Sequence, residues 1–466
     1  MSPEDAARCP VDHSAVASTP AGAAPAVPHW EGRAGQWSRL PGASRLAWSI
    51  NFGLARLMFG IAGRRGDQIA LLTTDPVLRA DPYPGYEALR EQGRIAVGEV
   101  ITATVDHALA REIFKSPDFG VGGDSKPRQG LLSDAYYGLT AQRHLGPVDA
   151  PSMLAVDGEL HTRYRRLVTR AFAARSVAQQ EDQVREIATG LLDDLEAEGL
   201  KEFDLVERYA GLLPVAVIAD MLGVSVDDRR RILDWGDSAA LLLDPDLTWR
   251  QYRRAVKDVA HLHDWIGDHV EHLRREPNDS LLGRLVQLEG DEALDDLELR
   301  ATALLLLGAG FETTVNLIAN AVHLLDEFPE QRYAAAQHGW AGVVEEALRF
   351  EPPVQLTLRV ATRSTEVAGR RYEPGHGILL ILGGANRDPE VFEDPHVFDV
   401  TRANAGEHLS LSHGAHYCIG ANLAKLEGRV ALEELYARFP DLQVTSGAHR
   451  RPNRVLRGWE SLPVSV

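Results

Sequence analysis

The residues with the clearest capacity for chemistry surround Cys418, one of two cysteines in the chain. The segment His408–Leu426 reads HLSLSHGAHYCIGANLAKL, a pattern that predicts a strand end and a turn before a helix over Ala421–Phe439. Cys418 would then lie just ahead of a helix N-terminus, where unpaired backbone N–H groups favour a thiolate. Gly414 and Gly420 would let the loop approach a bulky partner or adopt positive φ. A thiolate presented in this way suits an axial ligand of haem iron.

Two other roles for Cys418 stay open on the loop alone. Free cysteines are often ordinary small buried residues. A cysteine hydrolase would instead pair Cys418 with an imidazole, and His413 and His416 are the nearby candidates. The choice among a haem ligand, a packing residue and a nucleophile therefore depends on the rest of the chain.

A second chemically capable group lies in the longest apolar-periodic segment, Leu297–Phe328. Four polar side chains interrupt it: Glu312, Asn316, Asn320 and His323. They would be costly in a bilayer, so the segment predicts a buried central helix rather than a membrane span. Over residues 309–314 it reads AGFETT, where small residues leave a gap beside an acid and a hydroxyl. This notch suits a small ligand, although a helix-packing groove would have the same residues.

Two further pairs have helical spacing. His161 and Arg165 are four apart in the basic helix predicted for Asp157–Phe172, and two donors at that spacing can hold a carboxylate. Glu346 and Arg349 are three apart on another predicted helix, where an ion pair is common even on solvated faces.

The composition limits the function and the number of domains. The formal charge of −18 argues against a nucleic-acid partner, because binding phosphates needs a basic surface. Only Cys9 and Cys418 are present, which gives no disulfide framework and fits a cytoplasmic location. The first 28 residues lack the basic and apolar regions of a signal peptide and predict a flexible tail. No linker follows, so we expect residues 1–65 to form a tail and an amphipathic helix, and residues 66–466 one catalytic domain.

The N-terminal helix is predicted over Leu46–Ala62. Six apolar residues fall on one face: Leu46, Ile50, Leu54, Leu57, Met58 and Ile61. The segment is shorter than the ~20 apolar residues of a membrane span, and it contains Arg56. We expect the apolar face to pack on the body of the protein, and docking on a membrane surface is the alternative.

These motifs together resemble the cytochrome P450 superfamily. The haem-binding loop of that family reads Phe-Gly-x-Gly-x-His/Arg-x-Cys-x-Gly, and Gly414, His416, Cys418 and Gly420 match it, while Leu411 and Ser412 replace its phenylalanine and first glycine. The 309–314 hexapeptide resembles the oxygen-activation motif Ala/Gly-Gly-x-Asp/Glu-Thr, and Glu346 with Arg349 resembles the Glu-x-x-Arg helix. The resemblance runs from about Asp75 to the end of the chain.

The resemblance implies a mainly α fold with small β-sheets and a long central oxygen-binding helix. Cys418 would bind the iron of haem b, and Gly414 and Gly420 would shape its loop. Four donors would hold the haem propionates: His161, Arg165, Arg359 and His416. Three residues of the central helix would act in oxygen activation, Gly310 by leaving space, Thr313 as a hydrogen-bond partner for dioxygen and its waters, and Glu312 by passing protons from solvent.

The resemblance also implies which residues surround the substrate and which are structural. The substrate pocket would be bordered by Val354, Leu356, Ala309 and Trp459, beneath a loop over Phe119–Val156 with candidates Leu131, Leu132, Tyr136, Tyr137 and Leu139. Glu346 and Arg349 would be a structural pair whose third partner is expected at Val397, with His396 beside it.

The activity implied is that of a monooxygenase that inserts one oxygen atom of dioxygen into a hydrophobic small molecule. A ferredoxin and its reductase would supply electrons, docking on four cations: Lys425, Arg429, Arg163 and Arg166. We expect a monomer without a transmembrane segment. A peroxide-using enzyme and a non-catalytic haem protein of the same fold are the alternatives.

Overall fold

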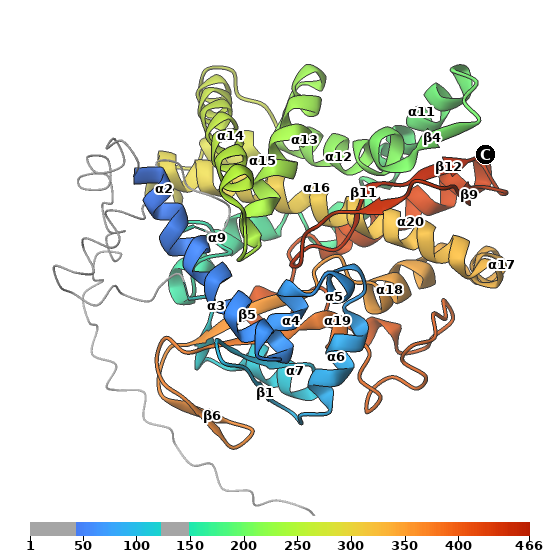
Figure 1. The fold of residues 1–466 in the computed structure, drawn as a ribbon. Coiled ribbons are helices and arrows are strands. Elements are labelled where there is room, and N and C mark those ends of the chain that lie inside the picture. The colour runs from blue at the N-terminus through green and yellow to red at the C-terminus, as the bar shows by residue number, and fades with distance from the viewer. Residues whose placement is uncertain (1–42, 123–148) are drawn as a thin grey trace, which may run out of the picture.

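The computed structural model describes residues 43–122 and 149–466, which form a helix-rich body with small β-sheets at two places on its periphery (Figure 1). Helix α16 (Asp296–Glu327) runs through the middle of this body. A capping box fixes its start, because the side chain of Asp295 accepts from the backbone N–H of Glu298 at 2.8 Å and the backbone N–H of Asp295 donates to the Glu298 carboxylate at 3.0 Å. The predicted mainly α fold with a long central helix is confirmed.

Helix α16 is apolar on every side, and the body encloses it. Four successive leucines, at positions 304 to 307, point in different directions around its axis, and all are buried. A helix with no polar face has to be covered on all sides. The covering helices are α12 (Leu212–Leu222), α13 (Val226–Ala240), α14 (Trp249–Arg275), α18 (Trp340–Phe350) and α20 (Ala421–Arg438). The prediction of a buried central helix is therefore correct.

The largest sheet has five strands in the order β1-β2-β8-β5-β3 among the described residues. The β2–β8 pair is parallel and the others are antiparallel. Its strands are β1 (Ala96–Val97), β2 (Thr102–Thr104), β8 (Gly377–Ile381), β5 (Leu356–Ala361) and β3 (Phe119–Gly120). Ile378 and Leu380 pack in one core with apolar residues of α7 (His107–Lys115). The same core includes Leu409, so it holds the segment that leads into the cysteine loop.

Three smaller sheets complete the strands that the structure describes. They are β4 (Glu202–Asp204) with β12 (Pro463–Ser465) and β9 (Gln443–Val444), β10 (His449–Arg450) with β11 (Trp459–Ser461), and β6 (Thr365–Val367) with β7 (Arg370–Tyr372). The remaining α-helices are α2 (Ala43–Trp48), α3 (Leu54–Arg64), α4 (Gln68–Thr74), α5 (Pro76–Ala80), α6 (Tyr83–Arg90), α9 (Gly158–Thr169), α10 (Ala174–Ala178), α11 (Glu181–Ala197), α15 (Leu281–Val286), α17 (Pro329–His338) and α19 (Leu382–Ala385).

The N-terminal helix differs from the prediction. Its apolar face was expected to pack on the body, yet Leu57 and Met58 are exposed, and the opposite face makes the contacts. The Trp48 side chain donates to the carbonyl of Leu247 at 2.9 Å, and the Phe52 ring lies 5.4 Å from that of Tyr252. A π-helical turn over Ser49–Gly53 explains part of the error, because its wider turn shifts the faces of α2 and α3 relative to a regular helix.

Two expectations concern residues outside the described ranges. The predicted tail of the first 28 residues is one of them. The five candidates of the pocket loop, Leu131, Leu132, Tyr136, Tyr137 and Leu139, are the other, so only the two ends of that loop are described.

Candidate haem and oxygen site

One large cavity, of about 810 Å³, lies between the cysteine loop, α16, α9 and β5. Residues from all of these elements line it, among them Cys418, Gly310, Thr313, His161, Arg359 and Val354. Its size is within the range of small-molecule and cofactor sites. The structure therefore brings the chemically capable groups of the sequence together around one space.

The loop that carries Cys418 is built of turns and not of the predicted strand end. A short 3₁₀ helix spans Gly414–His416, and the backbone N–H of Cys418 donates to the carbonyl of Leu411 at 2.8 Å. Ser412 has φ of 64°, a left-handed conformation that costs a non-glycine residue roughly 1–2 kcal/mol. This is the position where the resembling motif has glycine. Helix α20 begins three residues after the cysteine, as predicted.

The two glycines of the loop do different things. Gly414 has φ of 70°, and a Cβ there would collide with the carbonyl oxygen of Phe114 on α7, so this glycine lets α7 pack against the loop. It is not among the residues that line the cavity. Gly420 has φ of −83°, and a Cβ there would lie 4.0 Å from the Cys418 sulfur. Gly420 thus leaves room beside the sulfur, and positive φ is not its reason.

The surroundings of Cys418 act on its pKa in two directions. Burial raises the pKa of its thiol, while the backbone N–H of Gly420 and the charges of Arg165 and Lys425 lower it. The backbone N–H at the helix start thus acts in the predicted direction, and burial outweighs it. A coordinated metal ion deprotonates a thiol outright, so the loop fits a ligand that ionises when iron binds.

A cluster of hydrogen-bond donors lies at the edge of the cavity. The rings of His161 and His416 are 4.2 Å apart, and Arg165 donates to the carbonyl of Tyr417 at 2.6 Å. Burial, together with the charges of His416 and Arg165, lowers the pKa of His161 to about 4. The Nε2 of His416 lies 2.8 Å from a carboxylate oxygen of Asp157, a partner that sequence reasoning missed.

Arg359 adds a buried guanidinium to the same edge. It donates to the carbonyl of Leu358 at 2.9 Å and to the hydroxyl of Thr357 at 3.2 Å. Burial lowers its pKa to about 10. Among the described residues no carboxylate forms a hydrogen bond with it, although buried charges are normally paired. A group with its own carboxylates, such as the propionates of haem, fits this surplus of donors.

The notch on α16 faces the same cavity. A Cβ on Gly310 would lie 3.0 Å from the side chain of Ile218, so a larger residue there would force this side chain of α12 to shift by a few tenths of an ångström. The hydroxyl of Thr313 donates to the carbonyl of Ala309 at 3.0 Å, and that of Thr314 to the carbonyl of Gly310 at 3.4 Å. These bonds are the predicted mid-helix back-bonds, and they compete with the helix ladder.

Glu312 is almost fully buried behind the notch. Its carboxylate lies 3.1 Å from the guanidinium of Arg451, which is also 3.2 Å from the carboxylate of Asp237. Burial raises the pKa of Glu312 to about 8, against the opposing charge of Arg451. Sequence reasoning missed Arg451 and Asp237, because both are distant in the chain and no local spacing links them to α16.

Three of the four predicted pocket residues, Val354, Leu356 and Ala309, line the cavity. Trp459 does not, so that prediction is wrong. Its ring packs 4.5 Å from the ring of His323 and 4.1 Å from the guanidinium of Arg450, inside the core. The preceding loop, residues 453–457, reaches the cavity instead.

Glu346 and Arg349 form a fully buried ion pair with two contacts of 2.7 Å. The third partner is Arg402, whose Nε lies 3.3 Å from the Glu346 carboxylate. The expectation of Val397 is wrong, because Val397 offers only its carbonyl, to Arg349 at 2.9 Å and to Arg402 at 3.0 Å. His396 has no part in the network either.

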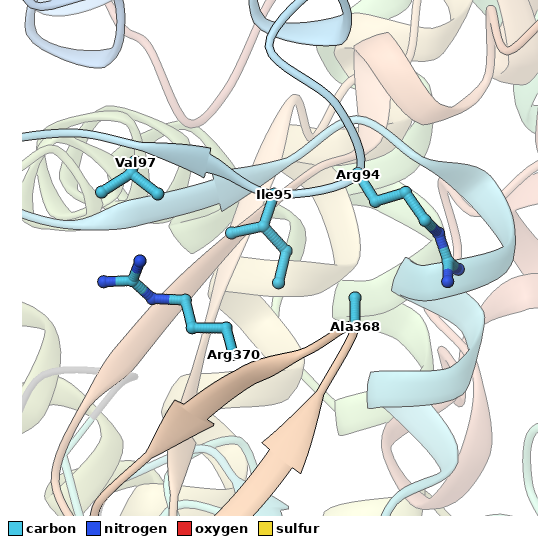
Figure 2. A pocket seen from close by; sticks show the side chains of 5 residues that line it. All are labelled: Arg94, Ile95, Val97, Ala368 and Arg370. Atoms are coloured by element: carbon cyan, nitrogen blue, oxygen red, sulfur yellow. The ribbon is translucent and has the colours of Figure 1, made fainter.

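A second hollow, of about 470 Å³, lies between β1 and the β6–β7 hairpin (Figure 2). Its lining consists of Arg94, Ile95, Val97, Ala368 and Arg370. Arg94 is already paired with Asp106 at 2.7 Å. The lining of this hollow offers no acid, hydroxyl, imidazole or thiol. The larger cavity is therefore the candidate active site.

The fold and the site define a haem protein with a cysteine ligand, and comparisons with known proteins agree. The family model described as Cytochrome P450 matches residues 137–335 and 341–453. The chain is 42% identical to cytochrome P450 140 of Mycobacterium tuberculosis over 431 residues, which cover 91% of this chain and 97% of that protein. It is 35% identical to the cytochrome P450 monooxygenase PikC of Streptomyces venezuelae over 398 residues, 83% of this chain and 91% of that one.

The solved structure of CYP164A2 from Mycobacterium smegmatis in its ligand-free state is similar at a TM-score of 0.75 and 34% identity, covering 86% of this chain and 100% of that chain. The chain therefore belongs to the cytochrome P450 family. As a member it binds haem b, needs redox partners and acts as a monooxygenase on small molecules. The peroxide-using and non-catalytic alternatives are not favoured, and a cysteine hydrolase does not fit the family.

Proposed function

We propose that this monooxygenase inserts oxygen into a hydrophobic substrate held above Cys418, which binds the haem iron. The single observation that supports this best is that Cys418 and the Gly310–Thr313 notch line one cavity with a surplus of cationic donors at its edge. Haem supplies the redox and dioxygen chemistry when bound. Arg359 and Arg165 would hold its propionates by charge and hydrogen bonds, and His161 and His416 by hydrogen bonds.

Proton delivery falls to Thr313 and Glu312 in this proposal. With a pKa of about 8, the Glu312 carboxyl keeps its proton at neutral pH and can give it up to a neighbour. Asp237, whose side chain is 38% exposed, can exchange protons with solvent. Arg451 bridges the two carboxylates, and Thr313, one residue along α16, has its hydroxyl at the cavity wall.

The substrate class follows from the lining of the cavity. Val354, Leu356, Leu305 and Ile218 give it apolar walls. Such walls favour a lipid, terpenoid, steroid or polyketide-like molecule over a sugar or nucleotide. A screen of hydrophobic ligands by the shift of the haem absorption band tests this choice.

A ferredoxin, reduced by its own reductase, is the proposed electron donor. The four cations first considered for docking are all ion-paired within the chain, Lys425 with Glu345, Arg429 with Glu181, Arg163 with Glu298 and Arg166 with Glu292. Lys115 and Arg111 on α7 are better candidates. Burial, together with their charges, lowers the pKa of His413, which puts these two cations near the start of the cysteine loop.

This docking site can be tested by charge reversal. Lys115→Glu should raise the KM for an acidic ferredoxin several-fold at low salt, and the difference should vanish at high salt. Lys257→Glu, on exposed α14, is the matched control and should leave the KM unchanged. Equal effects of the two substitutions would argue against docking at α7.

We further propose that residues 66–466 are a single catalytic domain and that the protein is a cytoplasmic monomer. The large cavity takes residues from Ile69 to Arg457, which supports one domain. Phe59 of α3 also lines the cavity, so the N-terminal helix completes the domain. Light scattering of the purified protein tests the monomer.

The role of Cys418 has a direct test. Cys418→Ser should remove the absorption band that thiolate-ligated haem shows when the reduced protein binds carbon monoxide. Cys9→Ser, the other cysteine of the chain, is the matched control and should keep the band. A band that survives in Cys418→Ser would reject the proposed ligand.

A further inference from the structure

The outer face of the N-terminal helix carries five exposed large apolar side chains that the proposed function does not explain. Its members are Leu46, Leu54, Leu57, Met58 and Ile61, and between 40% and 59% of each is exposed. Only 17% of the apolar window of Arg45–Arg64 is buried inside the protein. We call these five residues the apolar stripe. Contiguous apolar residues on a surface usually mark an interaction site.

The opposite face of the same helix is fastened to the body. The ring of Trp48 lies 5.9 Å from that of Trp249, and Phe52 packs on Tyr252. Arg56 donates to the carbonyl of Asp246 and lies 3.7 Å from its carboxylate. A transmembrane orientation would break these contacts and bury Arg56, so the helix can only lie along a surface.

The charge around the stripe favours one kind of partner. Residues 43–66 include four arginines and no acidic residue, in a chain with 67 acidic and 49 basic residues. Within the described residues the side chains of Arg45 and Arg64 form no ion pair, and Arg65 stays 66% exposed beside Glu99. An anionic lipid surface attracts such arginines, whereas a second copy would bring like charges together.

The stripe also lies beside the large cavity. Phe59, the residue after Met58 on α3, lines the cavity, and so do Ile69 and Leu72 of α4 and Leu78 of α5. Helices α2 to α5 follow one another along one side of the molecule (Figure 1). The same short helix thus has apolar side chains on the surface and an aromatic one at the end of the cavity.

We propose that the apolar stripe docks on an anionic lipid bilayer, with the helix lying in the plane of the membrane. This is the arrangement of interfacial helices, in which an apolar face enters the headgroup region and arginines meet anionic lipids. Docking turns the α3–α5 end of the cavity towards the lipid. The consequence for uptake of a hydrophobic substrate rests on the proposed function, but the docking itself does not.

The test is sedimentation of the haem-loaded full chain with phosphatidylcholine vesicles, with and without phosphatidylglycerol. We expect binding to the anionic vesicles that weakens as salt rises. A double variant, Leu57→Ser with Met58→Ser, should partition roughly tenfold less. The matched control is Tyr333→Ser, whose side chain is 74% exposed, and it should bind as the parent does. Tyr333 belongs to α17, a helix that lies far from α3 in Figure 1.

The charge is tested separately with Arg45→Gln and Arg64→Gln, which should reduce the preference for anionic vesicles. No binding by the parent, or equal binding by parent and stripe variant, would overturn the proposal. So would light scattering that shows a parental dimer dissociated by the stripe variant, because the occupant would then be a second copy. The carbon monoxide band of each sample reports the haem site, so failure of docking and failure of the proposed function are distinguishable.

Discussion

Helix α16 and the helical segment Arg45–Arg64 are both long and apolar enough to cross a membrane, yet the protein uses them in opposite ways. In α16, 78% of the apolar window is buried inside the protein, against 17% in the N-terminal segment. One polar side chain inside α16, that of Asn320, donates to the carbonyls of Glu351 and Arg457 at 3.2 and 3.1 Å. Composition therefore does not decide where an apolar helix lies. The neighbouring elements that cover the helix decide whether it is buried.

A matched pair of leucine truncations would test this contrast most directly. Leu325, on α16, is fully buried, so Leu325→Ala should lower the free energy of unfolding by about 3 kcal/mol through lost burial and a cavity. Chemical denaturation followed by circular dichroism measures the change. A loss below about 1 kcal/mol would mean that α16 is less tightly enclosed than the structure shows.

The second prediction concerns the notch over residues 309–314, the part of α16 that lines the cavity. Thr313→Ala removes the hydroxyl at the cavity wall and should lower dioxygen-driven turnover roughly 10²-fold, while peroxide-driven turnover is retained. Thr314→Ala is the control, because its hydroxyl is buried and bonded to the carbonyl of Gly310. Equal loss of both activities in Thr313→Ala would contradict a proton-relay role.

The acid on α16 predicts a dependence on pH. Because the pKa of Glu312 is about 8, its carboxyl carries a proton below that pH, and dioxygen-driven turnover should fall as pH rises through 8. Arg451 lowers this pKa, so Arg451→Gln should move the fall to higher pH. Peroxide-driven turnover serves as the internal control. A shift to lower pH would show that Arg451 is not the charge that acts on Glu312.

Some of the site could be predicted from sequence because its residues lie within one local element. Cys418 in its loop, Gly310 with Thr313, and Glu346 with Arg349 each need only helical or loop spacing, and the structure has them where the spacing predicts. Asp157, Arg402 and Arg451 could not be predicted, because each meets its partner across a long stretch of chain. Nothing in local periodicity encodes such a meeting.

The predictions for Trp459 and for the N-terminal helix failed for different physical reasons. Trp459 begins strand β11, and the loop that reaches the cavity, residues 453–457, ends two positions earlier. In the N-terminal helix the π-helical turn at Ser49–Gly53 changes the register between α2 and α3. Here the helix was predicted correctly and the direction of its side chains was not.

The smallest expected effect completes the leucine comparison. Leu57 is 59% exposed on α3, so Leu57→Ala should change the free energy of unfolding by less than about 0.5 kcal/mol. The same substitution in α16 is expected to cost several times more, and the same denaturation experiment measures both. A large loss in Leu57→Ala would mean that another part of the chain already covers the apolar stripe, since an exposed leucine has little burial to lose. Lipid docking needs an apolar stripe that the protein leaves uncovered. We therefore expect that truncating Leu57 hardly changes the free energy of unfolding but weakens binding to vesicles.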